Sequence, residues 1–196
     1  MARLVWSLVC VAGGLAANPA AAELIDFEGL ADGTVLTTQI AGATVSNAIV
    51  LSSGLSLNEF EFPPHSGLTV VSDDGGAMQI VFDAPVMQVS GFFTYAVPLA
   101  LTAFDAGGNA VATATSLFAN NLALSGAAGS SANELIALSF SGSFTRMVIQ
   151  GHPAGGSFVI DDLNITAVPE ASTYSLMLSG LLMAWIRSRR LRDVRK

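Results

Sequence analysis

Short apolar stretches with alternating polar positions dominate the chain between residues 23 and 168. In the segment 99–104, for example, Leu99, Leu101 and Ala103 would share one face of an extended strand, because side chains in a strand alternate with a period of two. Glycine-rich turn formers separate the stretches, and no long helical periodicity interrupts them. The pattern predicts strands at 24–28, 43–51, 68–71, 78–82, 86–95, 99–105, 110–118, 135–140, 144–150 and 157–166.

Many short strands without a helix favour an all-β fold, specifically a β-sandwich of the jelly-roll type. A segment of this length is long enough to bury a substantial core. All eleven phenylalanines of the chain fall within it, and we expect them to supply much of that core. The sequence therefore predicts one β-sandwich module over residues 23–167.

The N-terminal residues have the layout of a secretory signal peptide. Arg3 provides the positive charge, an apolar run covers residues 4–16, and three alanines ending at Ala22 provide the small-residue cleavage pattern. We therefore predict a signal helix and cleavage within residues 1–22. Cys10 is the only cysteine and lies in this leader, so the mature protein is expected to contain no disulfide and no thiolate metal site.

The C-terminal residues have the layout of a short membrane anchor. An apolar run covers residues 174–186, and a basic cluster that includes Arg187, Arg189 and Arg190 follows it. A helix of this length spans about 20 Å, short of a hydrocarbon core of about 30 Å, so it crosses only with help from residues 171–173 and snorkelling arginines. The basic cluster places its C-terminal end in the cytoplasm. We predict a short transmembrane helix within 168–196.

Val168-Pro169-Glu170, the short apolar helix and the terminal arginines together resemble the PEP-CTERM sorting signal. Ala171 stands where that signal has its second proline. The resemblance implies a Gram-negative bacterium that exports exopolysaccharide, and processing of the tail by the membrane protease exosortase. It also implies transport across the inner membrane, attachment to that membrane through the tail before processing, and a final place in the envelope, at the outer surface or in the extracellular matrix. The alternative is an ordinary single-pass anchor.

Charge is distributed very unevenly along the chain. The formal net charge of the whole chain is −7, but residues 23–168 hold thirteen carboxylates and a single cation, Arg146, which is a net charge of −12. Nucleic acid is thereby excluded as a partner, because binding to phosphates needs a basic surface.

The module also resembles the galactose-binding-like jelly rolls of secreted carbohydrate-binding modules, on the segments 25–28, 100–105 and 158–163. In such modules, acids in the first and last strands can share a structural calcium ion. The resemblance implies one such ion, held by Asp26, Glu28, Asp161 and Asp162. Strand alternation would let at most one residue of the last pair point inward, with Asp161 favoured. The alternative interpretation is that all four are solvated carboxylates at strand ends.

Other candidate chemistry favours a non-enzyme. Glu59 and Glu61 could form a glycoside-hydrolysing pair, but we favour a solvated strand face opposite Phe60 and Phe62. The segment 73–76 could ligate calcium, although turn chemistry explains it without a ligand. The two histidines, His65 and His152, lie in predicted loops without zinc-protease spacing, and the chain contains no Gly-x-Ser-x-Gly motif. The sequence leaves open whether the fold assembles a Ser/His/Asp site.

Sugar binding is a common function of jelly rolls. Flat sugar-binding surfaces favour exposed Trp and Tyr, but both tryptophans, Trp6 and Trp185, lie in the terminal signals. Phe92, Phe93 and Tyr95 could form an aromatic patch, but we favour a strand with one buried face as the explanation. The prediction is a non-catalytic protein associated with exopolysaccharide or the biofilm matrix. The alternatives are a calcium-stabilised, lectin-like module with a specific glycan ligand and, third, a glycan-active enzyme.

Overall fold

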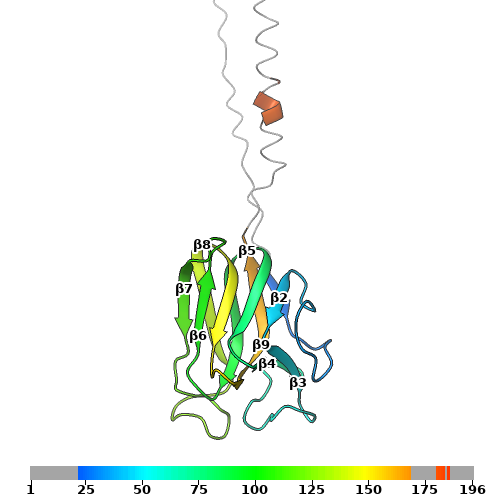
Figure 1. Cartoon of the computed structure of the whole chain (residues 1–196), viewed down its shortest axis with the longest axis vertical. Helices are drawn as coiled ribbons and strands as arrows, with labels where there is room; N and C mark the ends of the chain where they lie inside the picture. Colours follow the sequence, from blue (N-terminus) through cyan, green and yellow to red (C-terminus); the bar gives the residue numbers. More distant parts are fainter. Residues whose placement is uncertain (1–21, 169–179, 184, 186–196) are drawn as a thin grey trace, which may run out of the picture. The chain divides into compact units, whose positions relative to one another are not determined.

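The computed structural model describes residues 22–168, 180–183 and 185 (Figure 1). Residues 22–168 lie in one compact unit. Its strands are β1 (Ala22–Ile25), β2 (Ala43–Ser46), β3 (Ala48–Ser52), β4 (Thr69–Asp74), β5 (Met78–Tyr95), β6 (Ala100–Phe104), β7 (Ala110–Thr115), β8 (Glu134–Gln150) and β9 (Gly155–Ala167). Residues 180–183 and 185 are helical. In the described parts of the chain, no helix has the length and apolar character needed to cross a membrane.

The strands form two layers because β5 and β8 are long and pass from one layer to the other. The hydrogen-bonded order is β3-β4-β9-β5-β8-β6-β7, with β1 beside β9 and β2 beside β5. Residues 78–82 of β5 pair with β2 and with the second part of β8, whereas residues 86–95 pair with β9 and the first part of β8. We call the layer of β1, β3, β4 and β9, with residues 86–95 of β5 and the first part of β8, the first sheet. The second sheet is the layer of β2, β6 and β7, with residues 78–82 of β5 and the second part of β8. The prediction of an all-β sandwich is confirmed.

Three predicted strand boundaries are wrong in an informative way. The segments 78–82 and 86–95 are one strand, because the exposed residues around Pro85 shift the register without ending the pairing. The segments 135–140 and 144–150 are likewise one strand, β8. The segment 43–51 is divided at Asn47, whose φ of 56° belongs to the left-handed region. The first two breaks mark the places where the chain changes sheets.

The main core lies between the two sheets. Phe93 and Phe158 come from the first sheet, and their ring centroids are 6.3 Å apart. Phe82 and Phe144 come from the second-sheet side and meet edge to face at 6.0 Å, an arrangement that adds to the energy of simple burial. Four of the eleven phenylalanines thus pair inside the module, as the sequence predicted for its core.

A second, smaller core lies on the outer face of the first sheet. Leu57, Val70 and Val159 are buried there, and Leu51 and Phe62 pack against them. The chain between β3 and β4, which we call the 53–68 loop, supplies Leu57 and Phe62 and covers the outer side of β4. In Figure 1 this loop and the 116–133 loop lie at the end of the sandwich opposite the start of β1 and the end of β9.

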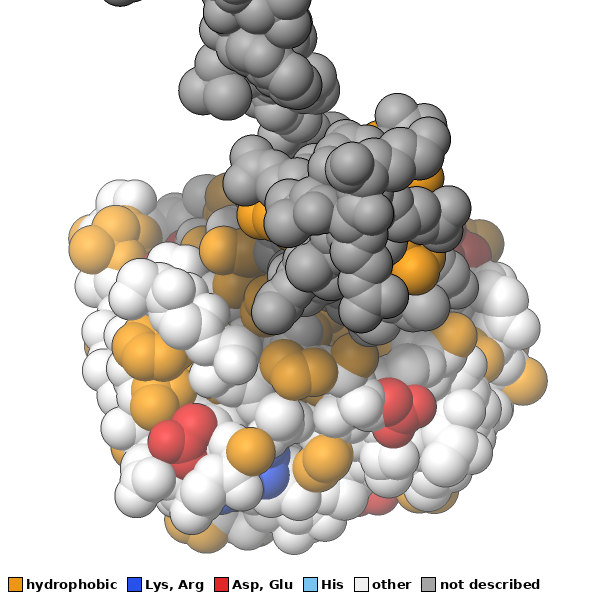
Figure 2. All heavy atoms as spheres, turned by 90° about the horizontal axis from the view of Figure 1, so that it is seen from above, with side chains coloured by type: hydrophobic (Ala, Val, Ile, Leu, Met, Phe, Trp, Pro, Cys, Tyr) orange, Lys and Arg blue, Asp and Glu red, His pale blue; other side chains and the backbone are white. Residues whose placement is uncertain are grey.

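The surface of the sandwich is poor in cations. The part that is visible from above shows hydrophobic side chains and scattered carboxylates, with few basic atoms (Figure 2). Arg146 is the only cation among the described residues. Its guanidinium lies 3.8 Å from the centroid of the Phe104 ring and donates to Gln79 Oε1 at 3.3 Å, so it belongs to the second sheet.

Candidate functional site

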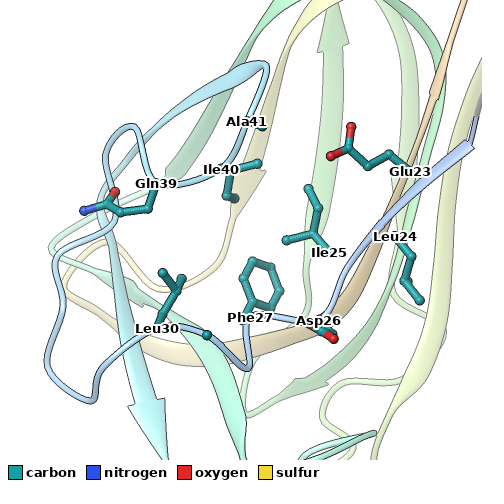
Figure 3. A pocket seen from close by; sticks show the side chains of 10 residues that line it. Glu23, Leu24, Ile25, Asp26, Phe27, Leu30, Gln39, Ile40 and Ala41 are labelled. Atoms are coloured by element: carbon teal, nitrogen blue, oxygen red, sulfur yellow. The ribbon is translucent and has the colours of Figure 1, made fainter.

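A cleft of about 300 Å³ opens beside β1 and the turn that follows it (Figure 3). Its apolar lining includes Ile25, Phe27, Leu30 and Ile40. Gln39 is the one neutral polar side chain among the lining residues, and its amide is already bonded within its own turn. Its Oε1 accepts from the backbone N–H of Thr37 at 2.6 Å, and its Nε2 donates to the carbonyl of Val35 at 3.2 Å. The cleft therefore combines apolar contact with two carboxylates, Glu23 and Asp26, and with one amide that is already bonded.

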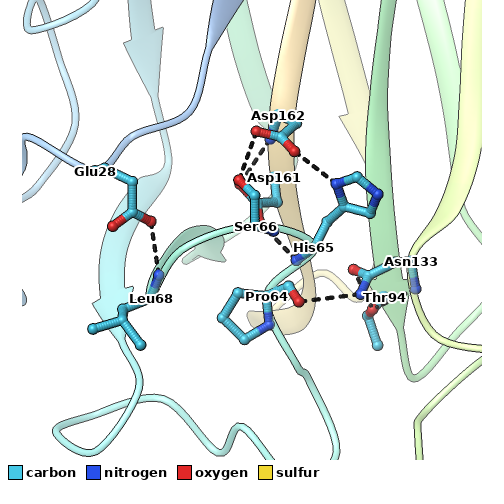
Figure 4. A network of polar contacts seen from close by, with 9 residues as sticks. All are labelled: Glu28, Pro64, His65, Ser66, Leu68, Thr94, Asn133, Asp161 and Asp162. Carbon is cyan, nitrogen blue, oxygen red and sulfur yellow. Dashed lines mark hydrogen bonds and ion pairs between the residues drawn. The ribbon is translucent and has the colours of Figure 1, made fainter.

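A richer constellation lies where the end of the 53–68 loop meets β9 (Figure 4). Glu28 Oε1 accepts hydrogen bonds from the backbone N–H groups of Leu68 and Thr69, both at 2.8 Å. Asp161 Oδ2 accepts from the N–H groups of His65 at 2.7 Å and Ser66 at 2.9 Å. Hydrogen bonds to ionised acceptors are among the strong ones. The two carboxylates therefore fix the end of the loop to the first sheet.

Asp162 adds a second set of contacts to the same loop. Its Oδ2 lies 2.6 Å from His65 Nδ1, and its Oδ1 accepts from the Ser66 hydroxyl at 2.9 Å. The bond through Nδ1 leaves Nε2 as the remaining polar atom of the imidazole. His65, Ser66 and Asp162 are thus brought together by the fold, but the serine hydroxyl donates to the carboxylate and not to the imidazole.

The expectation that alternation separates Asp161 from Asp162 is wrong. Ser90 is opposite Asn164 and Phe92 is opposite Asp161, so β9 holds one extra residue at this point. This is a β-bulge, and Asp162 adopts a left-handed φ of 48° within it. The bulge turns both carboxylates toward the 53–68 loop. Asp161 is the more buried of the two, with 1% of its surface exposed.

Burial has an electrostatic consequence for Asp161. Desolvation raises the pKa of this carboxyl above its ordinary value, and the charge of the neighbouring Asp162 acts in the same direction. The backbone N–H groups of Ser66, Asp162 and His65 oppose the rise in pKa, because they stabilise the ionised form. Asp161 therefore anchors the loop, and its burial costs part of the solvation free energy of the ionised carboxylate.

The imidazole of His65 lies flat on the ring of Phe92. Their centroids are 3.4 Å apart and the planes are inclined by only 6°. Asn133 donates to the carbonyl of Pro64 at 3.4 Å and is also bonded to Thr94 of β5. Strand β5 therefore also holds the loop. We did not predict the role of His65 from the sequence, because its partner Asp162 lies 97 residues further along the chain.

Phe92 stands at one end of an exposed part of the first sheet, which we call the open face. Side chains alternate along these strands. Val89, Phe93 and Ile165 point inward and are buried, and the side chains between them point outward. Cross-strand pairing aligns them on four neighbouring strands. The open face consists of Leu24, Gln88, Ser90, Phe92, Leu135, Ala137, Ser139, Asn164 and Thr166. These side chains are hydroxyls, amides and apolar groups, and none of them is charged.

The three aromatic residues at the end of β5 do not form one surface patch. Phe93 and Tyr95 are buried, with 1% and 0% of their surfaces exposed, whereas Phe92 faces outward. The Tyr95 hydroxyl donates to Glu134, and burial together with this bond raises the pKa of Tyr95. Tyr95 therefore supports the 116–133 loop from inside, and Phe92 with His65 forms the aromatic part of the surface.

Glu59 and Glu61 do not lie on a strand. The backbone N–H groups of Glu61 and Phe62 both donate to the carbonyl of Asn58, so the segment is a turn, and Phe60 is 71% exposed. Glu61 Oε2 accepts from the N–H groups of residues 124 and 125 at 3.1 and 3.2 Å. Glu61 therefore joins the two long loops, and the expectation of a strand face with Phe60 opposite is wrong.

The four carboxylates of the calcium prediction are placed as follows. Asp161, Asp162 and Glu28 contact the end of the 53–68 loop, while Asp26 is exposed and accepts from the N–H of Glu28 at 3.2 Å. Over the described residues, no three Asp, Glu, His or Cys side chains are gathered closely enough to hold a metal ion. The contacts recorded for these carboxylates are with protein donors, and the calcium ion stays a prediction.

Most of the predicted sorting tail lies outside the described residues, including Pro169, Glu170, Arg187, Arg189 and Arg190. Val168 is described, and its N–H donates to the carbonyl of Pro85 at 3.1 Å. Val168 is thus held against the module by one hydrogen bond.

Comparison with known proteins gives only distant likenesses. No family model and no curated protein matches the chain. Among solved structures, it is similar to the K2 cleaved adhesin domain of Lys-gingipain, at 14% identity and a TM-score of 0.48, over 74% of this chain and 99% of that one. It is also similar to the family 11 carbohydrate-binding module of the cellulase Lic26A-Cel5E of Clostridium thermocellum, at 12% identity and a TM-score of 0.34, over 77% and 97% of the two chains. A DUF4465 family protein from Bacteroides caccae matches at 11% identity and a TM-score of 0.38, over 80% and 96%. Likenesses this distant carry no argument about function.

Proposed function

We propose that this chain is an exported, non-catalytic protein whose jelly-roll sandwich binds extracellular polysaccharide through the open face. The observation that supports the proposal is the composition of that face. It combines uncharged hydroxyl and amide side chains with the flat stack of His65 on Phe92 at one end.

Each component of the open face matches one part of a sugar. Amides such as Gln88 and Asn164 can donate and accept hydrogen bonds with sugar hydroxyls. Apolar and aromatic groups such as Leu135 and Phe92 can pack against the C–H faces of a pyranose. The few polar groups of such a site then fix the orientation of the sugar. In neutral His65, Nδ1–H donates to Asp162, so Nε2 is an acceptor for a further hydroxyl.

The face is also prepared for binding. Glu28, Asp161 and Asp162 fix the 53–68 loop, and that loop holds His65 on Phe92. A side chain that is already held in place loses less conformational entropy when a ligand binds. Asp162 and Asp161 therefore act as positioning residues for the His65 end of the face.

The same contacts support a non-catalytic role. Hydrolysis of a glycoside needs two carboxyl groups set across the scissile bond, about 5–10 Å apart. Asp161 and Asp162 are instead adjacent in the chain and face the loop that they anchor, and Glu61 joins two loops.

Export and sorting complete the proposal. The residues 1–22 would direct export, and Val168-Pro169-Glu170 with the arginines that follow would direct processing by exosortase at the inner membrane. The sandwich would then reach the envelope or the surrounding exopolysaccharide, where its ligand is found.

Affinity electrophoresis tests the binding proposal. The full chain is run in native gels that contain soluble hydroxyethyl cellulose, galactomannan, pullulan or dextran. We expect at least one of them to retard the protein, and His65→Ala to weaken that retardation about tenfold. His152→Ala is the matched control, because His152 lies in the loop between β8 and β9 and its side chain accepts a bond from the N–H of Ala154 in the same turn. Equal binding by the His65→Ala variant and the wild type would contradict the assignment of the site.

A further inference from the structure

We propose that the open face selects uncharged glycans and rejects glycans that carry carboxylate or sulfate groups. The inference rests on the proposed function, because it names the class of ligand that the same surface accepts. It follows from where the charges of the module lie.

No side chain of the open face can neutralise an anion. The face consists of hydroxyl, amide and apolar groups. The one described cation, Arg146, is held over Phe104 and bonded to Gln79 on the outer face of the second sheet. An acidic polysaccharide on the open face would therefore find no arginine or lysine of the described residues to pair with.

The borders of the open face are acidic. Asp162 stands next to His65 and Phe92, and Asp26 follows directly after β1, whose Leu24 belongs to the face. The module as a whole carries thirteen carboxylates against one arginine. Charges separated by less than the Debye length of about 8 Å at physiological salt are only partly screened. An anionic ligand is repelled at the borders as well as unpaired on the face.

The polar atoms that the face does present suit neutral hydroxyls. Gln88 and Asn164 offer both a donor and an acceptor, and Ser90, Ser139 and Thr166 offer hydroxyls. A buried or partly buried carboxylate needs several donors or a cation to compensate for lost water. A sugar hydroxyl needs only one or two such partners.

Matched polymers separate this inference from the proposed function. Hydroxyethyl cellulose is compared with carboxymethyl cellulose, and pullulan with carboxymethyl pullulan, so that the backbone is constant and the charge changes. In affinity electrophoresis of the full chain at 0.15 M NaCl, we expect the charged derivative to bind about tenfold more weakly than its neutral counterpart. The difference should narrow as salt screens the repulsion.

The possible outcomes are distinct. Equal or tighter binding of the charged derivatives would overturn the selectivity and leave the proposed glycan binding in place. Retardation by none of the polymers would overturn both. Addition of EGTA is included, because binding of carboxymethyl derivatives that disappears with EGTA would mean that calcium bridges the charges, which also overturns the inference.

A variant pair places the selectivity on the open face. Ala137→Arg introduces a cation in the middle of the face, and Ala100→Arg introduces the same charge at an exposed alanine of β6 in the second sheet. We expect Ala137→Arg alone to lose neutral binding or to gain binding of the carboxymethyl derivative. An equal change in both variants would show that net charge, and not the face, controls the preference. Circular dichroism confirms that both variants are folded.

Discussion

Removal of the Asp161 carboxylate should loosen the candidate site and destabilise the module. This carboxylate is 1% exposed and accepts from three backbone N–H groups, those of His65, Ser66 and Asp162. A buried N–H that loses its acceptor costs about 1–3 kcal/mol. Burial raises the pKa of Asp161, so the Asp161→Ala variant also recovers part of a desolvation cost. We therefore expect the free energy of unfolding to fall by about 2–4 kcal/mol, less than three full penalties.

The measurement is urea and thermal unfolding of the protein, followed by circular dichroism. In a domain of this size, 1 kcal/mol corresponds to roughly 3 °C, so the melting temperature should fall by about 6–12 °C. Asp26→Ala is the control, because this exposed carboxylate accepts a single bond from Glu28 and should change stability by less than about 0.5 kcal/mol. Amide exchange at His65 and Ser66 should become faster in Asp161→Ala. A variant within about 0.5 kcal/mol of the wild type, with unchanged exchange, would refute the anchoring role.

Three further predictions address the metal, pH and sorting. The calcium prediction requires EGTA to lower the melting temperature of calcium-loaded protein, and an unchanged temperature would refute it. The pH prediction follows from the raised pKa of Asp161. The contribution of this carboxyl to the free energy of unfolding is largest below the unfolded pKa of about 3.9 and is lost as pH rises through the folded pKa. The advantage of the wild type over Asp161→Asn should therefore shrink as pH rises. Asp105 shows the opposite sign, because bonds from Asn109 lower its pKa, so its contribution is lost as pH falls through the folded pKa, and the advantage over Asp105→Asn should grow with pH. Deletion of residues 168–196 should abolish processing at the inner membrane, and identical fractionation of the truncated and full-length chains would contradict the sorting proposal.

The sandwich was predictable because its strands follow a simple rule. A half-buried strand alternates apolar and polar side chains, and segments such as 99–105 carry that alternation without help from distant residues. The joins inside β5 and β8 were not predictable in the same way. Asp83 and Pro85 look like a turn locally, and only pairing with two different partners keeps the strand intact across them.

The candidate site was predictable only in part. The resemblance directed attention to Asp26, Glu28, Asp161 and Asp162, and the last three contact the end of the 53–68 loop. Their common partner, the end of the 53–68 loop, could not be inferred, because it lies about a hundred residues from β9 and shows no periodic pattern. Alternation also failed at Asp162, since one extra residue in a bulge reverses the side to which a carboxylate points.

Because this acidic module has a single arginine, its carboxylates bond mainly to donors other than cations. Among the described residues, the one close contact between a carboxylate and a basic side chain is that of Asp162 Oδ2 with His65 Nδ1, at 2.6 Å. Other carboxylates take backbone N–H groups instead: Asp73 accepts from Ser157 at 2.7 Å and from Phe158 at 3.0 Å, and Asp161 and Glu28 do the same for the 53–68 loop.

Bonds of this kind act at short range, and those of Asp73 are buried, so salt should leave them intact. Repulsion among thirteen carboxylates acts at long range and opposes the compact state. Salt shortens the Debye length from about 30 Å at 0.01 M to about 10 Å at 0.1 M. The urea midpoint should therefore rise when NaCl is increased over this range, and equally with KCl. A midpoint that falls would mean that screened attractions between opposite charges hold the module together, which is incompatible with backbone N–H groups as the main partners of its carboxylates.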